Sequence, residues 1–106
     1  MSQNPSRRLL AADEARALQQ SLAGGQLSAD GKGLLRRYAF PDFDAAVEFV
    51  NRLAVVANRR DHHPDLKVGW GYCEVLYTTH DAGGLTVLDG ELARETQALF
   101  DAWPGG

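Results

Sequence analysis

All three histidines of the chain, His62, His63 and His80, fall within residues 62 to 80. An unperturbed imidazole has a pKa of about 6.5, so it can deliver or remove a proton near neutral pH. A single histidine is more simply explained as a surface or capping residue. Three in one short segment instead indicate a shared site for proton transfer, of the kind that a lyase needs.

Pro64 follows His62 and His63 directly, and it decides whether both rings can face one pocket. Adjacent side chains diverge by about 100° on a helix and point to opposite faces of a strand. A proline disfavours helical backbone at the residue before it. The HHP sequence therefore predicts an irregular turn at a helix end, which would allow the two rings to share a site.

Two other kinds of site deserve comparison with proton transfer. Three histidines are enough to hold a catalytic zinc ion, but adjacent histidines rarely aim at one ion and the HExxH spacing is absent. Cys73 is the single cysteine, which excludes a multi-thiolate zinc site, and no predicted base lies beside it. We therefore expect neither a metal site nor a cysteine nucleophile.

The composition predicts one globular domain over residues 1–106. The apolar content is 44% and the charged content 24%, as in ordinary soluble proteins. No stretch approaches the roughly 20 apolar residues of a membrane span, and no apolar signal core follows Arg7 and Arg8. We expect a cytoplasmic protein that is not bound to a membrane. The net charge of −3 also disfavours nucleic acid as a partner.

The first half of the chain predicts a helix, a hairpin and a second helix. Residues 11 to 22 are rich in good helix formers, and residues 26 to 40 contain turn residues between two short extended segments. The second helix opens after Pro41 and cannot continue comfortably past His63. Its apolar residues recur at three- and four-residue spacing and predict this buried face: Phe43, Ala46, Val47, Val50, Ala54 and Ala57.

The second half predicts two strands within residues 65 to 80 and a last helix. Alternation places Cys73, Val75 and Tyr77 on one strand face and His80 on the other, more polar face. Thr86 and Asp89 are spaced as an N-cap pair for the helix that follows. The element order α-β-β-α-β-β-α predicts an α+β fold, in which three helices cover one face of a four-stranded antiparallel sheet.

The segment DHHPDLKVGWGYCEVLYTTHDAGGLTVLD resembles the signature of the pterin-4a-carbinolamine dehydratases. In that family two histidines and a proline are followed by an aromatic residue, a histidine and an aspartate at characteristic spacings. His62, His63 and Pro64 are here followed at those spacings by Trp70, His80 and Asp89. With flanking segments such as FPDFDAAVEFVNRLA, the resemblance covers roughly residues 33 to 100.

The resemblance implies dehydration of 4a-hydroxytetrahydropterin to quinonoid dihydropterin, a step of tetrahydrobiopterin recycling, with no metal or redox cofactor. It implies acid and base roles for His62 and His80, while His63 would bind and orient the pterin. Trp70 would help to shape the pocket. Pro64 and Asp89 also match the motif as substrate-binding positions, although a helix-capping role for Asp89 is at least as good an interpretation.

One motif position departs from the family pattern. Four residues before His62 the family usually has a charged residue, commonly glutamate, and this chain has Asn58. An amide hydrogen-bonds but cannot favour a protonated histidine as a carboxylate does. The family also includes a transcriptional coactivator and a Rubisco assembly factor of α-carboxysomes. The alternative hypothesis is therefore a scaffold that binds Rubisco or another protein.

The predicted sheet also bears on association. Four short strands leave unpaired edges, and pairing one edge with its mate across a two-fold axis would satisfy the exposed amides. We therefore expect a homodimer or a homotetramer.

Overall fold

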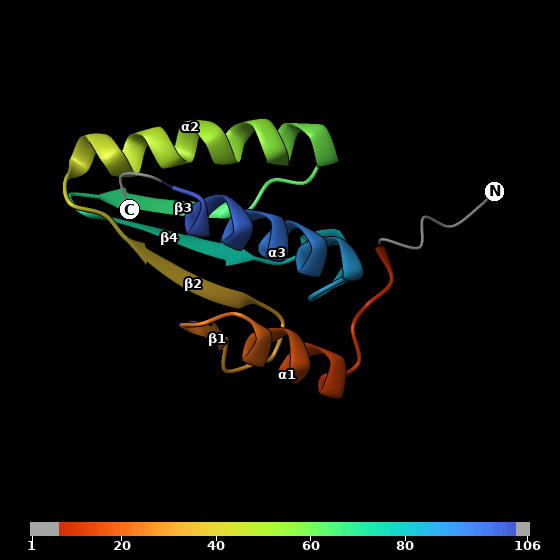
Figure 1. Cartoon of the computed structure of the whole chain (residues 1–106). Helices are drawn as coiled ribbons and strands as arrows, with labels where there is room; N and C mark the ends of the chain where they lie inside the picture. Colours follow the sequence, from red (N-terminus) through yellow and green to blue (C-terminus); the bar gives the residue numbers. More distant parts are fainter. Residues whose placement is uncertain (1–6, 104–106) are drawn as a thin grey trace.

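The computed structural model describes residues 7–103 and contains three helices and four strands (Figure 1). The helices are α1 (Ala12–Ser21), α2 (Phe43–Arg60) and α3 (Val87–Asp101). The strands are β1 (Gly25–Leu27), β2 (Leu34–Ala39), β3 (Asp65–Gly69) and β4 (Tyr72–Tyr77), and a short 3-10 turn, η2 (His80–Ala82), follows β4. This order confirms the predicted α-β-β-α-β-β-α sequence of elements.

The four strands form one antiparallel sheet in the order β1-β2-β4-β3. Cys73, Val75 and Tyr77 alternate with partly exposed residues along β4 and are buried, as the sequence predicted. These three side chains belong to the same core cluster as buried residues of all three helices. The helices therefore cover one face of the sheet, which confirms the predicted α+β architecture.

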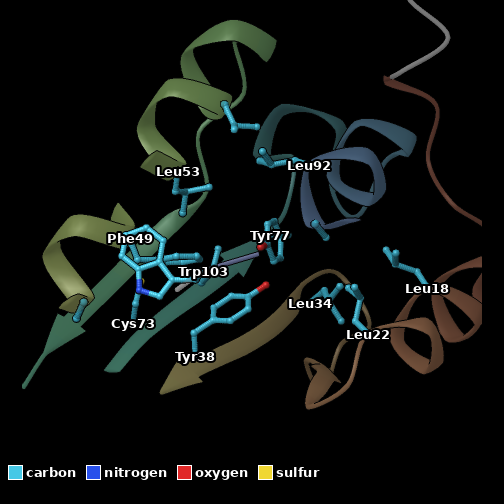
Figure 2. Packing of buried hydrophobic residues seen from close by; sticks show 14 of the residues in the cluster. Leu18, Leu22, Leu34, Tyr38, Phe49, Leu53, Cys73, Tyr77, Leu92 and Trp103 are labelled. Atoms are coloured by element: carbon cyan, nitrogen blue, oxygen red, sulfur yellow. The ribbon is translucent and has the colours of Figure 1, made fainter. Parts of the chain in front are cut away.

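The buried face of α2 differs from the predicted one. Ala46 and Ala57 are buried as expected, but Phe43 and Val47 are 48% and 36% exposed. The helix is apolar on more than one side, so periodicity alone could not select the face that packs. Phe49, whose ring centroid lies 5.0 Å from that of Tyr38, is among the large side chains that occupy the core instead (Figure 2). The buried residues of α2 are Ala46, Phe49, Leu53, Val56 and Ala57.

The ends of α2 are fixed by two local interactions. At its start, the Asp42 carboxylate accepts a hydrogen bond from the Ala45 amide at 2.8 Å. At its end, Asp61 adopts the left-handed conformation with φ 51°, and the His62 amide donates to the Ala57 carbonyl at 3.1 Å. The helix thus stops just before the histidine pair, as Pro64 predicted. Within residues 7–103 no helix is long and apolar enough to cross a membrane.

Candidate active site

His62 and Asp89 form a buried pair at the centre of the candidate site. His62 follows the end of α2, and Asp89 is the third residue of α3, so the two helices bring them together. The His62 Nε2 atom lies 2.5 Å from Asp89 Oδ1, and the two residues are 8% and 0% exposed. A carboxylate in the first turn of a helix is also stabilised by the positive end of the helix dipole.

The second oxygen of Asp89 is held by donors from two threonines. Asp89 Oδ2 accepts from the Thr79 hydroxyl at 2.6 Å and from the Thr86 amide at 2.9 Å. The two threonine hydroxyls are also 2.9 Å apart. Asp89 therefore caps α3 and orients His62 at the same time. Because it is fully buried, the structure places it behind His62 and not at a surface that a substrate could touch.

This arrangement determines which ring nitrogen of His62 carries the hydrogen in the neutral form. An ionised carboxylate only accepts hydrogen bonds, so the Nε2 atom of His62 must carry the hydrogen that it donates to Asp89. Nδ1 has no hydrogen-bond partner among the contacts of residues 7–103. In the neutral ring, Nδ1 therefore bears the lone pair.

Asn58 contacts His63, the neighbour of the buried histidine. Its amide oxygen accepts a hydrogen bond from His63 Nε2 at 2.9 Å, and both residues are exposed. Asn58 lies in the last turn of α2, so the departure from the family motif acts on His63. The partner of His63 is a neutral amide, which fixes the ring without adding a negative charge.

His80 lies on η2 with its side chain 80% exposed. Its Nε2 atom is 3.4 Å from Asp65 Oδ2 at the start of β3. His80 also lines an open pocket of about 390 Å³, together with Lys32 of the β1–β2 connection and Thr78. The preceding residue is Thr79, whose hydroxyl donates to Asp89, so one buried network supports the segments that carry His62 and His80.

Trp70 is not brought to the histidines within the chain. It is 73% exposed in the turn between β3 and β4, whereas Asp65 and His80 lie at the other end of these strands. At about 3.3 Å per residue, the length of β3 separates the two ends by roughly 13 Å. Pro64, in contrast, lies between His63 and Asp65 and is partly buried.

Thr79 was missed as a site residue by reasoning from the sequence. A signal was available, because Thr79 continues the buried alternation of Cys73, Val75 and Tyr77 and is the polar member of that series. A hydroxyl at an inward position requires a buried partner. Asp89 is that partner.

Within residues 7–103 no group of three or more His, Cys, Asp or Glu side chains could hold a metal ion. Burial raises the pKa of the Cys73 thiol from 9.0 to about 11, which keeps it protonated near neutral pH. Cys73 is thus a core residue rather than a nucleophile. The candidate chemistry rests on the imidazoles.

Comparison with known proteins identifies the family of this chain. The family model described as Pterin 4 alpha carbinolamine dehydratase matches residues 8–99, which include all three histidines and Asp89. The chain belongs to the pterin-4a-carbinolamine dehydratase family. A curated relative from Bradyrhizobium sp., named "Putative pterin-4-alpha-carbinolamine dehydratase", is 42% identical over 87% of this chain and 93% of its own length. A relative of the same name from Stenotrophomonas maltophilia is 43% identical over 78% of this chain and 72% of its own length.

Solved structures of the pterin-4a-carbinolamine dehydratase family share the fold. The crystal structure of a transcriptional coactivator/pterin dehydratase from Brucella melitensis superposes with a TM-score of 0.81. It is 29% identical in sequence, and the match covers 87% of this chain and 98% of that one. A pterin dehydratase-like protein identified as a RuBisCO assembly factor in the alpha-carboxysome has a TM-score of 0.55 and 22% identity, over 64% of this chain and 79% of that one. This second likeness concerns the fold alone.

Proposed function

We propose that this protein is a hydro-lyase that dehydrates 4a-hydroxytetrahydropterin to quinonoid dihydropterin. The observation that carries the proposal is the buried His62–Asp89 pair, which leaves the lone pair of the neutral His62 ring on Nδ1. Membership of the pterin-4a-carbinolamine dehydratase family supplies the substrate class.

The reaction needs one acid and one base and no change of oxidation state. The substrate carries a hydroxyl on C4a and a hydrogen on the adjacent N5. Protonation of the hydroxyl lets it leave as water when the C4a–O bond breaks. Removal of the N5 hydrogen leaves its bonding electrons to form the C4a=N5 double bond. The acid loses one proton and the base gains one, so the atoms balance without a cofactor.

The geometry supports a distinct part for each histidine. His62 is suited to act as the base, because Nδ1 bears the lone pair while Asp89 stabilises the imidazolium that forms. His80, exposed on η2, is suited to protonate the leaving hydroxyl. His63 is held by Asn58 and orients the pterin. Pro64 shapes the turn that follows the His62–His63 pair.

An assay of quinonoid dihydropterin formation from freshly generated carbinolamine tests the proposal. The wild type should accelerate dehydration over the uncatalysed rate, and His80→Ala should lower kcat by roughly 100-fold or more. Glu48→Ala is the matched control, because it removes an exposed side chain of α2 whose described contact is the ion pair with Arg52. A wild type that fails to accelerate dehydration would refute the proposal.

The alternative is a protein-binding scaffold that no longer catalyses dehydration. Asn58 favours it, because an amide replaces the family's usual charged residue, commonly glutamate, and His63 has no charged partner among residues 7–103. A scaffold should retain its cellular function, including any part in Rubisco assembly, in the His62→Ala/His80→Ala double variant. Loss of that function in a double variant that remains folded would rule the scaffold out.

A further inference from the structure

A second cavity adjoins the pocket that His80 lines. This α1 cavity has a volume of about 540 Å³ and lies between α1, the β1–β2 connection and residues 83–85. Cavities of roughly 300 to 1,000 Å³ are the usual size for small-molecule sites. The α1 cavity and the His80 pocket share these lining residues: Ser28, Asp30, Lys32, Gly83 and Gly84. A ligand that lies beside His80 can therefore reach the α1 cavity across this common border.

The α1 cavity combines apolar walls with two cations. Leu9, Ala15 and Leu27 are among its apolar wall residues. Arg16 of α1 and Lys32 of the β1–β2 connection supply the positive charges. Neither side chain forms an ion pair with a carboxylate within residues 7–103. Both charges therefore remain available to an anionic ligand.

Among residues 7–103, Asp30 is the carboxylate that lines the α1 cavity. Its Oδ1 atom accepts hydrogen bonds from the Ser28 hydroxyl at 2.6 Å and from the Lys32 amide at 2.9 Å. The Ser28 hydroxyl, and then the Lys32 amide, lower the pKa of this carboxyl, which is therefore ionised near neutral pH. Asp30 thus stabilises the turn of the β1–β2 connection. Two positive charges face one negative charge, so the cavity favours an anion.

Gly83 and Gly84 keep the border between the two cavities free of side chains. A Cβ atom added at Gly83 would have no atom within 4 Å. A Cβ atom added at Gly84 would lie 3.5 Å from Leu9 Cδ2 and 3.7 Å from Lys32 Cγ. The border is therefore open above Gly83, and Leu9 and Lys32 bound it at Gly84.

We propose that the α1 cavity binds the C6 substituent of the substrate and selects a tetrahydropterin whose substituent carries an aromatic ring and a terminal carboxylate. C6 is bonded to N5, so this substituent begins two bonds from the reacting C4a. With C4a beside His80, the substituent crosses the border at Gly83 and Gly84. The apolar walls then cover the ring, and Arg16 and Lys32 bind the carboxylate. This inference rests on the proposed function, because it places the substrate by His80.

Equilibrium binding by calorimetry tests the site without turnover. The probes are two fully oxidised pterins, which cannot be dehydrated. One carries an aminobenzoate group on C6, and the other carries the matching aminobenzamide. The wild type should bind the aminobenzoate probe about fivefold more tightly, because an ion pair at an exposed site contributes a factor of this size. The two affinities should converge in about 1 M salt, which screens the charges.

Removal of the two cations tests which residues select the carboxylate. Lys32→Gln and Arg16→Gln should each reduce the preference for the aminobenzoate probe, and the double variant should bind both probes equally. Arg94→Gln is the matched control and should keep the wild-type preference. Arg94 is also exposed and without an ion pair within residues 7–103, but it lines a different cavity. Equal binding of both probes by the wild type, or a preference that survives in the double variant, would overturn the proposal.

Gly84→Val tests whether the substituent crosses the border between the cavities. Its methyl groups would extend beyond the Cβ position that already contacts Leu9 and Lys32. Affinity for both probes should fall about tenfold, because the added atoms overfill the border. Affinity for 6-methylpterin, whose substituent is too short to reach the border, should stay at the wild-type value. An equal loss for all three ligands would place the pterin ring itself at Gly84 and overturn the proposed placement.

The dehydration assay separates this inference from the proposed function. An inactive wild type would refute the proposed function, whereas the binding preference would still decide whether the α1 cavity selects a carboxylated pterin. In an active wild type, the carbinolamine with the aminobenzoate group should have a kcat/KM about fivefold above that of its aminobenzamide counterpart. Lys32→Gln should reduce this ratio through KM, because Lys32 binds a part of the substrate that does not react.

Discussion

His63 and Asn58 form the contact where this chain departs from the family motif. The amide oxygen of Asn58 lies 2.9 Å from His63 Nε2 and carries no charge. In Asn58→Glu a carboxylate would take the place of that amide and favour the protonated ring. We therefore expect the protonated form of His63 to be more favoured in the variant than in the wild type. The measurement is a titration of the histidine ring signals by NMR, combined with the pH profile of dehydration.

A carboxylate added elsewhere on α2 provides the control for that titration. Asn51→Glu places the same charge at an exposed position of α2, away from the contact with His63. The signals of His63 should move in Asn58→Glu and stay unchanged in Asn51→Glu. An equal change in both variants would show that the overall charge of the helix, and not the direct contact, controls His63.

Asp89 is the residue on which both the buried network and His62 depend. In Asp89→Asn the amide cannot accept from all the donors that now hold the carboxylate, and it can present an N–H to His62 instead. We expect a loss of about 2 kcal/mol in the free energy of unfolding. kcat should also fall by roughly 100-fold or more, because the hydrogen position on His62 is no longer fixed.

The variant Thr96→Val separates the loss of stability from the loss of catalysis. Thr96 is also fully buried on α3, and its hydroxyl donates to the Leu92 carbonyl at 2.7 Å. Urea denaturation should show a loss of stability in this variant too, of about 1 kcal/mol, while kcat stays at the wild-type value. Equal activity of Asp89→Asn and wild type would show that Asp89 only caps α3.

At the scale of elements, α2 is the helix that leads to the histidine pair, and its first turn is capped by Asp42. The Asp42 carboxylate accepts the Ala45 amide at 2.8 Å, and Asp42→Ala leaves that amide without its partner. We expect a loss of about 1 kcal/mol in urea denaturation. Asp44→Ala, also in the first turn but without a capping bond among the described contacts, should cost less. A larger loss in Asp44→Ala would contradict the capping assignment.

The elements could be predicted from the sequence wherever local chemistry and packing favoured the same answer. Pro64 indicated where α2 ends, and the alternation of Cys73, Val75 and Tyr77 indicated the buried face of β4. The prediction of the buried face of α2 was partly wrong. Phe43 and Phe49 are equally apolar in the sequence, but Phe43 is exposed and Phe49 is buried. Only the shape of the core, where Phe49 meets Tyr38, selects between them.

The candidate site was predictable in its residue types but not in its contacts. Thr86 and Asp89 were spaced as a cap, and the capping pair is present in α3. The contact of Asp89 with His62 joins two helices that are remote in sequence, so no local pattern contains it. Trp70 shows the converse case. It is close to Pro64 in sequence, but the extended strand β3 between them separates the two residues in space.

At the scale of the whole molecule, the core predicts a loss of stability in alkaline solution. Burial raises the pKa of Cys73 from 9.0 to about 11, and burial also raises the pKa of Tyr38. The folded state therefore keeps protons that the unfolded chain releases, and stability falls as the pH rises. For Cys73 this contribution is complete below pH 9 and is lost as the pH rises through about 11.

The difference between the two pKa values of Cys73 corresponds to roughly 3 kcal/mol, since each pH unit is worth about 1.4 kcal/mol per proton. Urea denaturation between pH 8 and pH 11 should show this decline in the wild type. Cys73→Ala should have a lower free energy of unfolding at pH 8, because the substitution leaves a small cavity. Its free energy of unfolding should then fall less steeply with pH, by the slope that one proton contributes. Buried tyrosines, including Tyr38, account for the remaining slope. Identical slopes in the two proteins would show that the Cys73 thiol ionises as readily in the folded core as in the unfolded chain.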